Sequence, residues 1–161
     1  MSEARKEYTI PTFSYLIKFV SKQYGQRSPI QVDEYTAMGK FITLSLLDRR
    51  PWKEYASFNT PERSDKLSAS LKIILTKEQS EMAVRKSKLL RINTDLDRLF
   101  KEHMITFIEA LRTNGIPASH ACKQFLLYFH IEETEYSFDA AYKHYKRQKV
   151  KRVHARIAAA A

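Results

Sequence analysis

The sequence is poor in cysteine and glycine, and it holds no long apolar run. Its 161 residues include one Cys and three Gly. The single cysteine, Cys122, can form neither an intramolecular disulfide nor a cysteine-rich zinc site. No apolar stretch approaches the roughly 20 residues of a membrane-spanning helix, and the N-terminal MSEARKEY lacks the apolar centre of a signal peptide. We therefore expect a protein of a reducing compartment, cytoplasmic or associated with a nucleoid or nucleoprotein particle, with no membrane contact.

Signatures of catalysis are missing as well. The three glycines lie too far apart for a phosphate-binding or dinucleotide-binding loop, and no histidine pair has the HExxH spacing of a zinc protease. His103 and Cys122 fall on apolar faces of expected helices, where a packed side chain is the usual role. Asp95, Asp97 and Glu102 suit helix capping and ion pairing better than a metal site. We expect no enzyme, no metal and no cofactor.

The chain does have enough apolar material for a core. Hydrophobic residues make up 43% of the sequence and aromatic residues 12%. A chain of this length usually folds as one domain. Its apolar side chains recur mostly at spacings of three and four, which is the pattern of amphipathic helices. We therefore expect a mainly α protein in which residues 1–161 form a single helical domain.

A pair of helices is expected over residues 10–50. Polar residues 2–9 precede the pair, and we expect them to be mobile. The first helix opens at Pro11 and ends at Gly25, because glycine is the usual residue just past a helix C-terminus. The second helix begins near Asp33, whose carboxylate suits the N-cap position. Apolar residues cover more than one side of this second helix, which predicts burial.

Residues 51–67 form an expected linker that is rich in proline and aromatic residues. The segment shows no sustained period, which is typical of an exposed connection. Its aromatic side chains have two alternative roles, as anchors on the core or as a protein-binding surface at 52–58. These side chains are Trp52, Tyr55 and Phe58.

The next segment, residues 67–76, alternates apolar and polar side chains and predicts a short strand or extended arm. A single strand needs a partner, because its backbone groups must be paired when they are buried. We expect that partner to be the aromatic linker or a second copy of the chain. The second alternative makes a homodimer a hypothesis.

Three helices are expected over residues 93–157. Asn93 or Thr94 caps the first and longest helix, whose apolar residues repeat at three and four. Pro117 occupies the first turn of a short second helix. Ser137 caps a third, basic helix.

This order of helices resembles in outline the tri-helical core of helix-turn-helix DNA-binding domains. The resemblance covers roughly residues 94–156 and includes the tight Gly-Ile-Pro turn before the second helix. The linker HIEETEY departs from the family, because it is longer than the usual turn of about three to four residues. The resemblance implies that the helix beginning at Ser137 is the one presented to the major groove.

The positive charge of the protein is concentrated at its C-terminal end. The formal net charge is +10, and residues 141–161 contain seven Lys and Arg but no acid. Such a segment is typical of nucleic-acid binding, because each cation that neutralises a phosphate releases condensed counterions. Acidic residues precede it and mark its boundary. They are Glu132, Glu133, Glu135 and Asp139.

All seven basic residues are candidates for nucleic-acid contacts. They are Lys143, Lys146, Arg147, Lys149, Lys151, Arg152 and Arg156. Arg147 and Arg152 are the best candidates for base edges or bidentate phosphate contacts, because guanidinium offers a planar fork. A smaller basic cluster lies upstream. It consists of Arg85, Lys86, Lys88 and Arg91.

These patterns predict a basic, non-enzymatic DNA-binding protein. Duplex DNA is favoured over RNA because the tyrosines do not reproduce an aromatic RNA-binding signature. One alternative is a structural subunit of a virion or nucleoprotein particle, whose basic end neutralises charge. Another is an adaptor or inhibitor that binds an acidic protein surface. A solvated basic tail without a partner is the simplest alternative.

Overall fold

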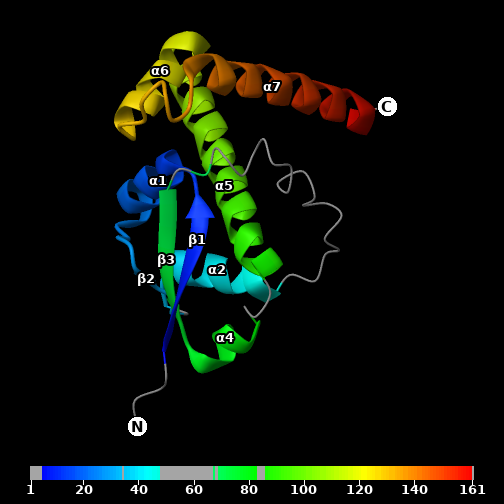
Figure 1. The fold of residues 1–161 in the computed structure, drawn as a ribbon. Coiled ribbons are helices and arrows are strands. Elements are labelled where there is room, and N and C mark those ends of the chain that lie inside the picture. Colours follow the sequence, from blue (N-terminus) through cyan, green and yellow to red (C-terminus); the bar gives the residue numbers. More distant parts are fainter. Residues whose placement is uncertain (1–4, 34, 48–66, 68, 83–85, 161) are drawn as a thin grey trace. The chain divides into compact units, whose positions relative to one another are not determined.

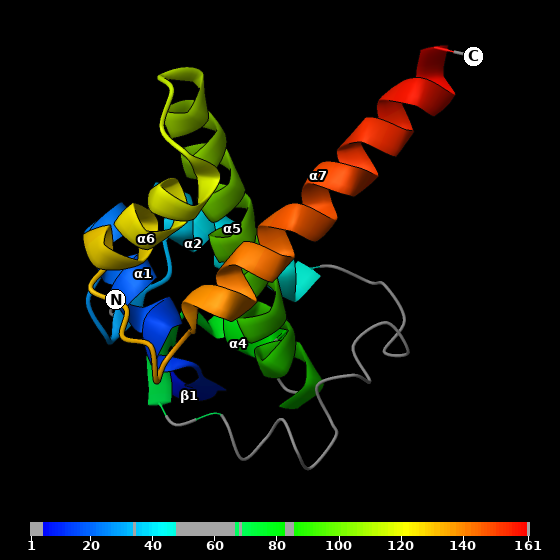
Figure 2. The ribbon, with the colours of Figure 1, turned by 90° about the horizontal axis from the view of Figure 1, so that it is seen from above.

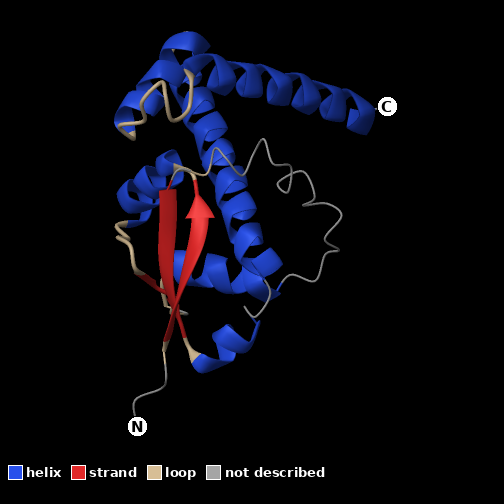
Figure 3. Ribbon diagram, viewed as in Figure 1, coloured by secondary structure: helices blue, strands red, loops and turns tan. Residues whose placement is uncertain are grey.

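The computed structural model describes residues 5–33, 35–47, 67, 69–82 and 86–160, with the backbone alone for 82, 86, 87 and 152–160. Over these residues the protein is mainly helical, with one small sheet (Figure 3). This confirms the predicted fold class. The elements in chain order are β1 (Lys6–Thr12), α1 (Ser14–Tyr24), β2 (Ile30–Gln31), α2 (Ala37–Leu47), β3 (Ala69–Leu75), α4 (Lys77–Met82), α5 (Lys86–Thr113), α6 (Ala118–Tyr128) and α7 (Phe138–Ala160).

The chain divides into two compact units, Met1–Phe100 and Lys101–Ala161. The boundary falls inside helix α5 and not in the predicted linker, residues 51–67. The N-terminal part of α5 therefore belongs to the first unit, which also holds the sheet. Its C-terminal part belongs to the second unit together with α6 and α7.

The sheet of the first unit has the strand order β1-β3-β2, so β3 is the central strand (Figure 1). β1 runs antiparallel to β3 with Lys6 opposite Leu75 and Thr12 opposite Ala69. β2 runs parallel to β3 on its other side. The predicted strand at 67–76 thus exists. It pairs with β1 along its whole length and with β2 at Ile73 and Ile74.

The partner of this strand was predicted wrongly. Among the described residues, β3 pairs with the N-terminal segment and with β2. The aromatic linker lies outside the described residues. Lys6–Thr12 is a strand, not part of a mobile end or of a helix opening at Pro11. The reason is burial at every second residue of β1, with Ile10 and Thr12 in the core. A strand of seven residues with two inward apolar or β-branched positions gives only a weak signal in the sequence. The pairing with β3 also removes the observation that motivated a homodimer.

The two helices predicted for residues 10–50 are α1 and α2. Gly25 ends α1 in the left-handed conformation, at φ 64°, as predicted. Asp33 acts one turn before α2, where its carboxylate accepts the N–H groups of Tyr35 and Thr36, both at 2.9 Å. The Thr36 hydroxyl then accepts the N–H of Gly39 at 3.0 Å and is the actual cap.

Helix α5 begins at Lys86, seven residues before the predicted start at Asn93. Asn93 and Thr94 are interior residues of this helix. Asn93 is buried, and its side-chain oxygen accepts a hydrogen bond of 2.5 Å from the hydroxyl of Thr12. The hydroxyl of Thr94 donates to the carbonyl of Leu90 within the helix at 3.2 Å. Asn93, which resembles a cap in the sequence, is therefore a contact between α5 and the strand β1.

The core of the first unit forms where α1 meets α5. The ring of Phe100 lies 4.9 Å from that of Tyr15 and 5.5 Å from that of Phe19, between ring centroids. The Tyr15 hydroxyl donates a 2.8 Å hydrogen bond to the buried carboxylate of Asp97. Aromatic packing and buried polar contacts together fix α5 on this unit.

The second unit contains the end of α5, the short helix α6 and the long helix α7. Gly115, with φ 82°, forms the turn after α5, and Pro117 precedes the first residue of α6. Phe125 of α6 packs on Phe107 of α5 with 5.4 Å between ring centroids. Figures 1 and 2 both show the C-terminal part of α7 extending away from α6. Three successive helices are thus present, as predicted.

Candidate nucleic-acid interface

The acidic residues before α7 hold the start of this helix. The carboxylate of Glu133 accepts the backbone N–H of Phe138 through both oxygens, at 3.1 and 3.0 Å. The hydroxyl of Ser137 accepts the N–H of Ala140 at 3.2 Å, which confirms Ser137 as the cap. Asp139 forms a 2.8 Å ion pair with Lys143 one turn later. Negative charge at a helix N-terminus is favourable, so these acids have a structural role.

Tyr145 anchors α7 on α5. Its side chain is buried, and its hydroxyl donates a 2.5 Å hydrogen bond to Oε1 of Glu109. The guanidinium of Arg112 donates to the same hydroxyl at 2.9 Å and to Glu109 at 3.2 Å. A neutral phenol, a carboxylate and a guanidinium therefore satisfy one another at the crossing of the two helices.

These contacts shift the pKa values of Glu109 and Tyr145. The hydrogen bond from Tyr145, followed by smaller effects that include the charges of Arg112 and Lys149, lowers the pKa of Glu109. Burial, together with the hydrogen bond to Glu109, raises the pKa of Tyr145. The carboxylate is thus held ionised and the phenol protonated, which is the state in which the anchor is complete.

Aromatic rings and lysines alternate on the first turns of α7. The rings of Phe138 and Tyr142 stack with 5.6 Å between centroids and 11° between planes. The ammonium group of Lys146 lies 4.5 Å from the centroid of Tyr142, and that of Lys123 in α6 lies 5.3 Å from the centroid of Phe138. These contacts orient two lysines on one surface without neutralising their charge.

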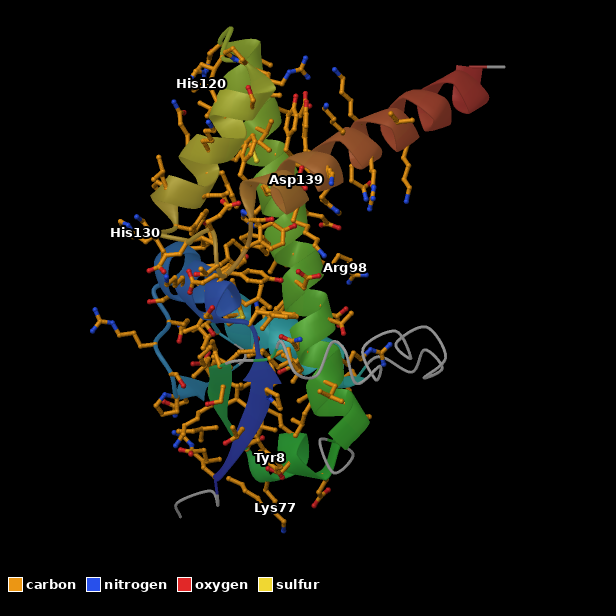
Figure 4. The ribbon with its side chains drawn as sticks, turned by 45° about the horizontal axis from the view of Figure 1, so that its top comes forward. Tyr8, Lys77, Arg98, His120, His130 and Asp139 are labelled. Atoms are coloured by element: carbon orange, nitrogen blue, oxygen red, sulfur yellow. The ribbon has the colours of Figure 1, made fainter. Side chains whose placement is uncertain are left out.

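Beyond Tyr145, helix α7 is exposed on several sides. Lys146 and Arg147 are exposed, and so are the three consecutive residues Lys149, Val150 and Lys151. Three consecutive residues cover more than half of a helix circumference. Figure 4 shows Asp139 near the start of this helix and nitrogen-tipped side chains leaving it on more than one side.

Five of the seven predicted residues have described side chains, and all five are exposed on α7. They are Lys143, Lys146, Arg147, Lys149 and Lys151. The backbone of the helix continues through Arg152 and Arg156. The five described candidates are thus exposed together on one helix.

Two side chains of the second basic cluster are described, those of Lys88 and Arg91. Arg91 is buried with 6% of its surface exposed, because the first half of α5 lies in the core of the first unit. Lys88 is half-buried, and Lys86 is described by its backbone only. Arg85 lies outside the described residues, as does the aromatic segment 52–58. The cluster is thus not an exposed basic patch at Arg91.

Lys123 also lies near α7, although it was not among the predicted residues. This residue lies on α6, outside the basic segment, and reaches the start of α7 through its contact with Phe138. The helical period of α6 predicts that Lys123 is exposed, on the side opposite the buried residues Ala121, Cys122 and Phe125. The sequence does not predict its contact with Phe138, because that contact depends on how α6 and α7 pack.

Other sites of chemistry have little support among the described residues. A cavity of about 440 Å³ lies in the first unit between β2, β3, α2 and α4. Gln79 lines this cavity. Its side-chain carbonyl accepts a hydrogen bond from the backbone N–H of Thr76, and its side-chain N–H donates one to the hydroxyl of Thr43. No group of three or more potential metal ligands gathers in the described part of the chain.

The cysteine is packed, as predicted. Cys122 is buried on α6, and burial raises the pKa of its thiol to about 11. A thiol in this state is a weak nucleophile at neutral pH. Within the described ranges, no helix has the length and apolar character needed to cross a membrane.

Comparison with other proteins gives no family for this chain. No protein-family description, curated protein or solved structure matches it significantly. The resemblance to helix-turn-helix domains therefore stays a prediction based on helix order and charge.

Proposed function

We propose that this protein binds nucleic acid, and duplex DNA in particular, through the basic surface of α7 and without catalysis. The observation that carries the proposal is the exposure of Lys146, Arg147, Lys149 and Lys151 on a helix segment that contains no acid after Asp139. Among the described residues, none of these four side chains is held in an ion pair, as Lys143 is with Asp139, and exposed cations are available to phosphates. Each phosphate contact releases counterions, which supplies most of a nonspecific affinity.

Two features of α7 distinguish this proposal from a simple charged tail. The Tyr145 anchor fixes the helix on α5 immediately before the exposed lysines. The Asp139–Lys143 pair and the Glu133 cap use the acidic charges locally, so they do not neutralise the later cations. A positioned cationic helix loses less conformational freedom on binding than a disordered segment does.

A membrane-surface or helix-docking role is less well supported. Both roles require an apolar stripe opposite the charged face. Beyond Tyr145, α7 offers only Val150, Val153 and Ile157 and no Leu, Phe or Trp, and 53% of the surface of Val150 is exposed. An acidic protein surface is the competing partner, and binding to an acidic polypeptide distinguishes it from nucleic acid.

The proposal is tested by a variant that removes four charges from α7 while keeping the full chain. Lys146, Arg147, Lys149 and Lys151 are changed to Gln, which retains good helix propensity. Binding to a labelled duplex is measured by fluorescence anisotropy from 50 to 200 mM salt. We expect the slope of log K against log salt to fall by up to about 3.6, at about 0.9 for each phosphate that the protein no longer neutralises.

A matched control removes the same number of charges elsewhere. The control changes four exposed lysines of the first unit to Gln, namely Lys6, Lys22, Lys40 and Lys77. We expect this variant to keep most of the wild-type salt slope. If both variants lose the same amount of salt slope, the effect depends on net charge alone, and this result would contradict a site on α7.

Two further arms complete the experiment. A duplex of scrambled sequence measures specificity, because base contacts discriminate while phosphate contacts do not. An acidic polypeptide such as polyglutamate measures affinity for negative charge without a nucleic-acid backbone. Tighter binding to polyglutamate than to duplex would overturn the proposal in favour of an acidic protein partner.

A further inference from the structure

From the distribution of charge around α7, we infer that the outer half of this helix enters the major groove of B-form DNA and contacts phosphates on both walls. The inference rests on the proposed function and specifies the form of nucleic acid and the manner of binding. It concerns the part of α7 that follows the buried residue Tyr145.

The exposed cations of this segment lie on two flanks of the helix. A residue advances by about 100° around the axis, so Lys149 and Lys151 are about 160° apart. Lys146 lies one turn before Lys149, and Arg147 lies one turn before Lys151. We name the first pair the Lys149 flank and the second pair the Lys151 flank.

Both flanks are open to solvent at the same level of the helix. All four side chains are exposed, and Val150 between the two later lysines is exposed as well. The Lys149 flank continues the line of the buried residue Tyr145, which lies one turn earlier. The Lys151 flank continues the line that begins at the ion-paired Lys143.

This arrangement matches the dimensions of one groove. An α-helix with its side chains is about 10–12 Å across, and the major groove of B-DNA is about 12 Å wide. A helix inside that groove has a row of phosphates on each side, so cations on opposite flanks both find partners. On a single strand or a flat anionic surface, one flank would face away from the phosphates. The deep groove of A-form RNA is too narrow to admit the helix.

The distribution of charge along α7 also indicates which half of the helix enters the major groove. Helix-turn-helix proteins place the N-terminal residues of the recognition helix at the base edges. Here that end carries Asp139 and the Glu133 carboxylate, which repel phosphates. The cations follow one to three turns later. We therefore assign the groove contact to the later half of α7, in contrast to the binding mode that the helix-turn-helix resemblance implies.

The test uses two double variants of the full-length protein with the same loss of charge. K146Q/K149Q removes the Lys149 flank, and R147Q/K151Q removes the Lys151 flank. Each is titrated with a 20-base-pair duplex in increasing salt, and circular dichroism checks that the helix content is kept. We expect each variant to lower the salt slope by about 1.8, the value for two phosphates that are no longer neutralised.

Ethylation interference then locates the contacts on the duplex. The wild-type protein is expected to be sensitive to ethylated phosphates on both strands across one major groove. K146Q/K149Q should lose the sensitivity on one strand, and R147Q/K151Q should lose it on the other. Methyl green, a major-groove ligand, should compete with the protein, whereas netropsin, a minor-groove ligand, should not.

The outcomes separate this inference from the proposed function. If one double variant lowers the slope and the other leaves it unchanged, binding is one-sided and the groove inference is wrong, while the proposed function stands. Equal affinity for the duplex and for either of its single strands would also overturn the inference alone. If the quadruple variant binds duplex as the wild type does, the proposed function itself fails.

Discussion

At the scale of single residues, the hydroxyl of Tyr145 has the most consequential position in the second unit. It donates to Glu109 and accepts from Arg112, and the ring is buried. Removing the oxygen leaves a carboxylate and a guanidinium with one partner fewer at the crossing of α5 and α7. The geometry of this crossing sets the direction in which the basic half of α7 leaves the unit.

We expect Tyr145→Phe to lower the free energy of unfolding by about 1–2 kcal/mol at neutral pH, the cost of losing a hydrogen bond to a charged group. Urea unfolding followed by circular dichroism measures the change. Tyr142→Phe is the matched control, because Tyr142 lies on the same helix and contacts its neighbours through its ring. A loss in the control as large as that in Tyr145→Phe would show that the hydroxyl of Tyr145 has no special role.

The same variant has a defined pH dependence. The pKa of Glu109 is lowered in the folded protein, so its ionised form contributes stability above the ordinary pKa of a glutamate, and this contribution is lost as the pH falls through the lowered pKa. The hydrogen bond from Tyr145 is the largest cause. The difference between wild type and Tyr145→Phe should therefore be full above about pH 5 and should shrink on further acidification. A difference that grows in acid would contradict this assignment.

At the scale of elements, the first strand determines whether the sheet of the first unit forms. Ile10 is fully buried in β1 and lies opposite Leu71 of β3. The neighbouring Thr9 is exposed on the same strand, as the alternation of a strand requires. Substitutions at Ile10 and Thr9 therefore compare a buried and an exposed position of the same strand.

We expect Ile10→Ala to destabilise the protein by about 2–5 kcal/mol through loss of buried surface and creation of a cavity. Ile10→Val should cost about 0.5–1.5 kcal/mol and gives a measurable value if the alanine variant does not fold. Thr9→Val, which keeps the branched shape on the exposed side, should stay within about 0.5 kcal/mol. Unfolding curves that do not distinguish position 10 from position 9 would mean that the N-terminal segment is not a paired strand.

The elements also show what the sequence can and cannot predict. Helices α1, α2, α6 and α7 follow from the three-and-four spacing of apolar residues and from local signals such as Gly25, Pro117 and Ser137, all of which act within one turn. The strand pairing does not, because it joins residues about sixty positions apart. The start of α5 was predicted wrongly for the same reason. Asn93 has the residue type of a helix cap, but its side chain bonds to Thr12, which is distant in the sequence.

The same division holds for the candidate nucleic-acid interface: its charged residues could be predicted from the sequence, and its contacts between helices could not. The charge of α7 is local to one helix and was predicted residue by residue. The Tyr145 anchor and the reach of Lys123 depend on contacts between helices, which the sequence does not encode at a fixed spacing. The burial of Arg91 depends on the packing of α5 in the first unit, which the neighbouring basic residues in the sequence do not indicate.

At the scale of the whole molecule, the edges of the described sheet are poorly suited to the homodimer that the isolated strand suggested. β3 is paired on both sides, so the strands at the edges are β1 and β2. The edge strand β1 contains Pro11, which has no N–H to donate, and begins with the charged residues Lys6 and Glu7. The other edge, β2, is only two residues long. Short, charged or proline-containing edges are the usual means by which proteins prevent strand pairing between molecules.

We therefore expect no association through the sheet, and sedimentation equilibrium from 5 to 100 µM should give the mass of one chain. Repeating the measurement after Pro11→Thr, which restores an N–H to β1, tests whether the proline guards that edge. Association that appears only in this variant would confirm that the sheet is protected in the wild type. A wild-type dimer that dissociates on Lys6→Pro would contradict the argument, because such a dimer would have to pair through β1. A wild-type dimer that is indifferent to changes in β1 would have to use another surface, of which the exposed Leu127 and Tyr128 on α6 are the first to examine.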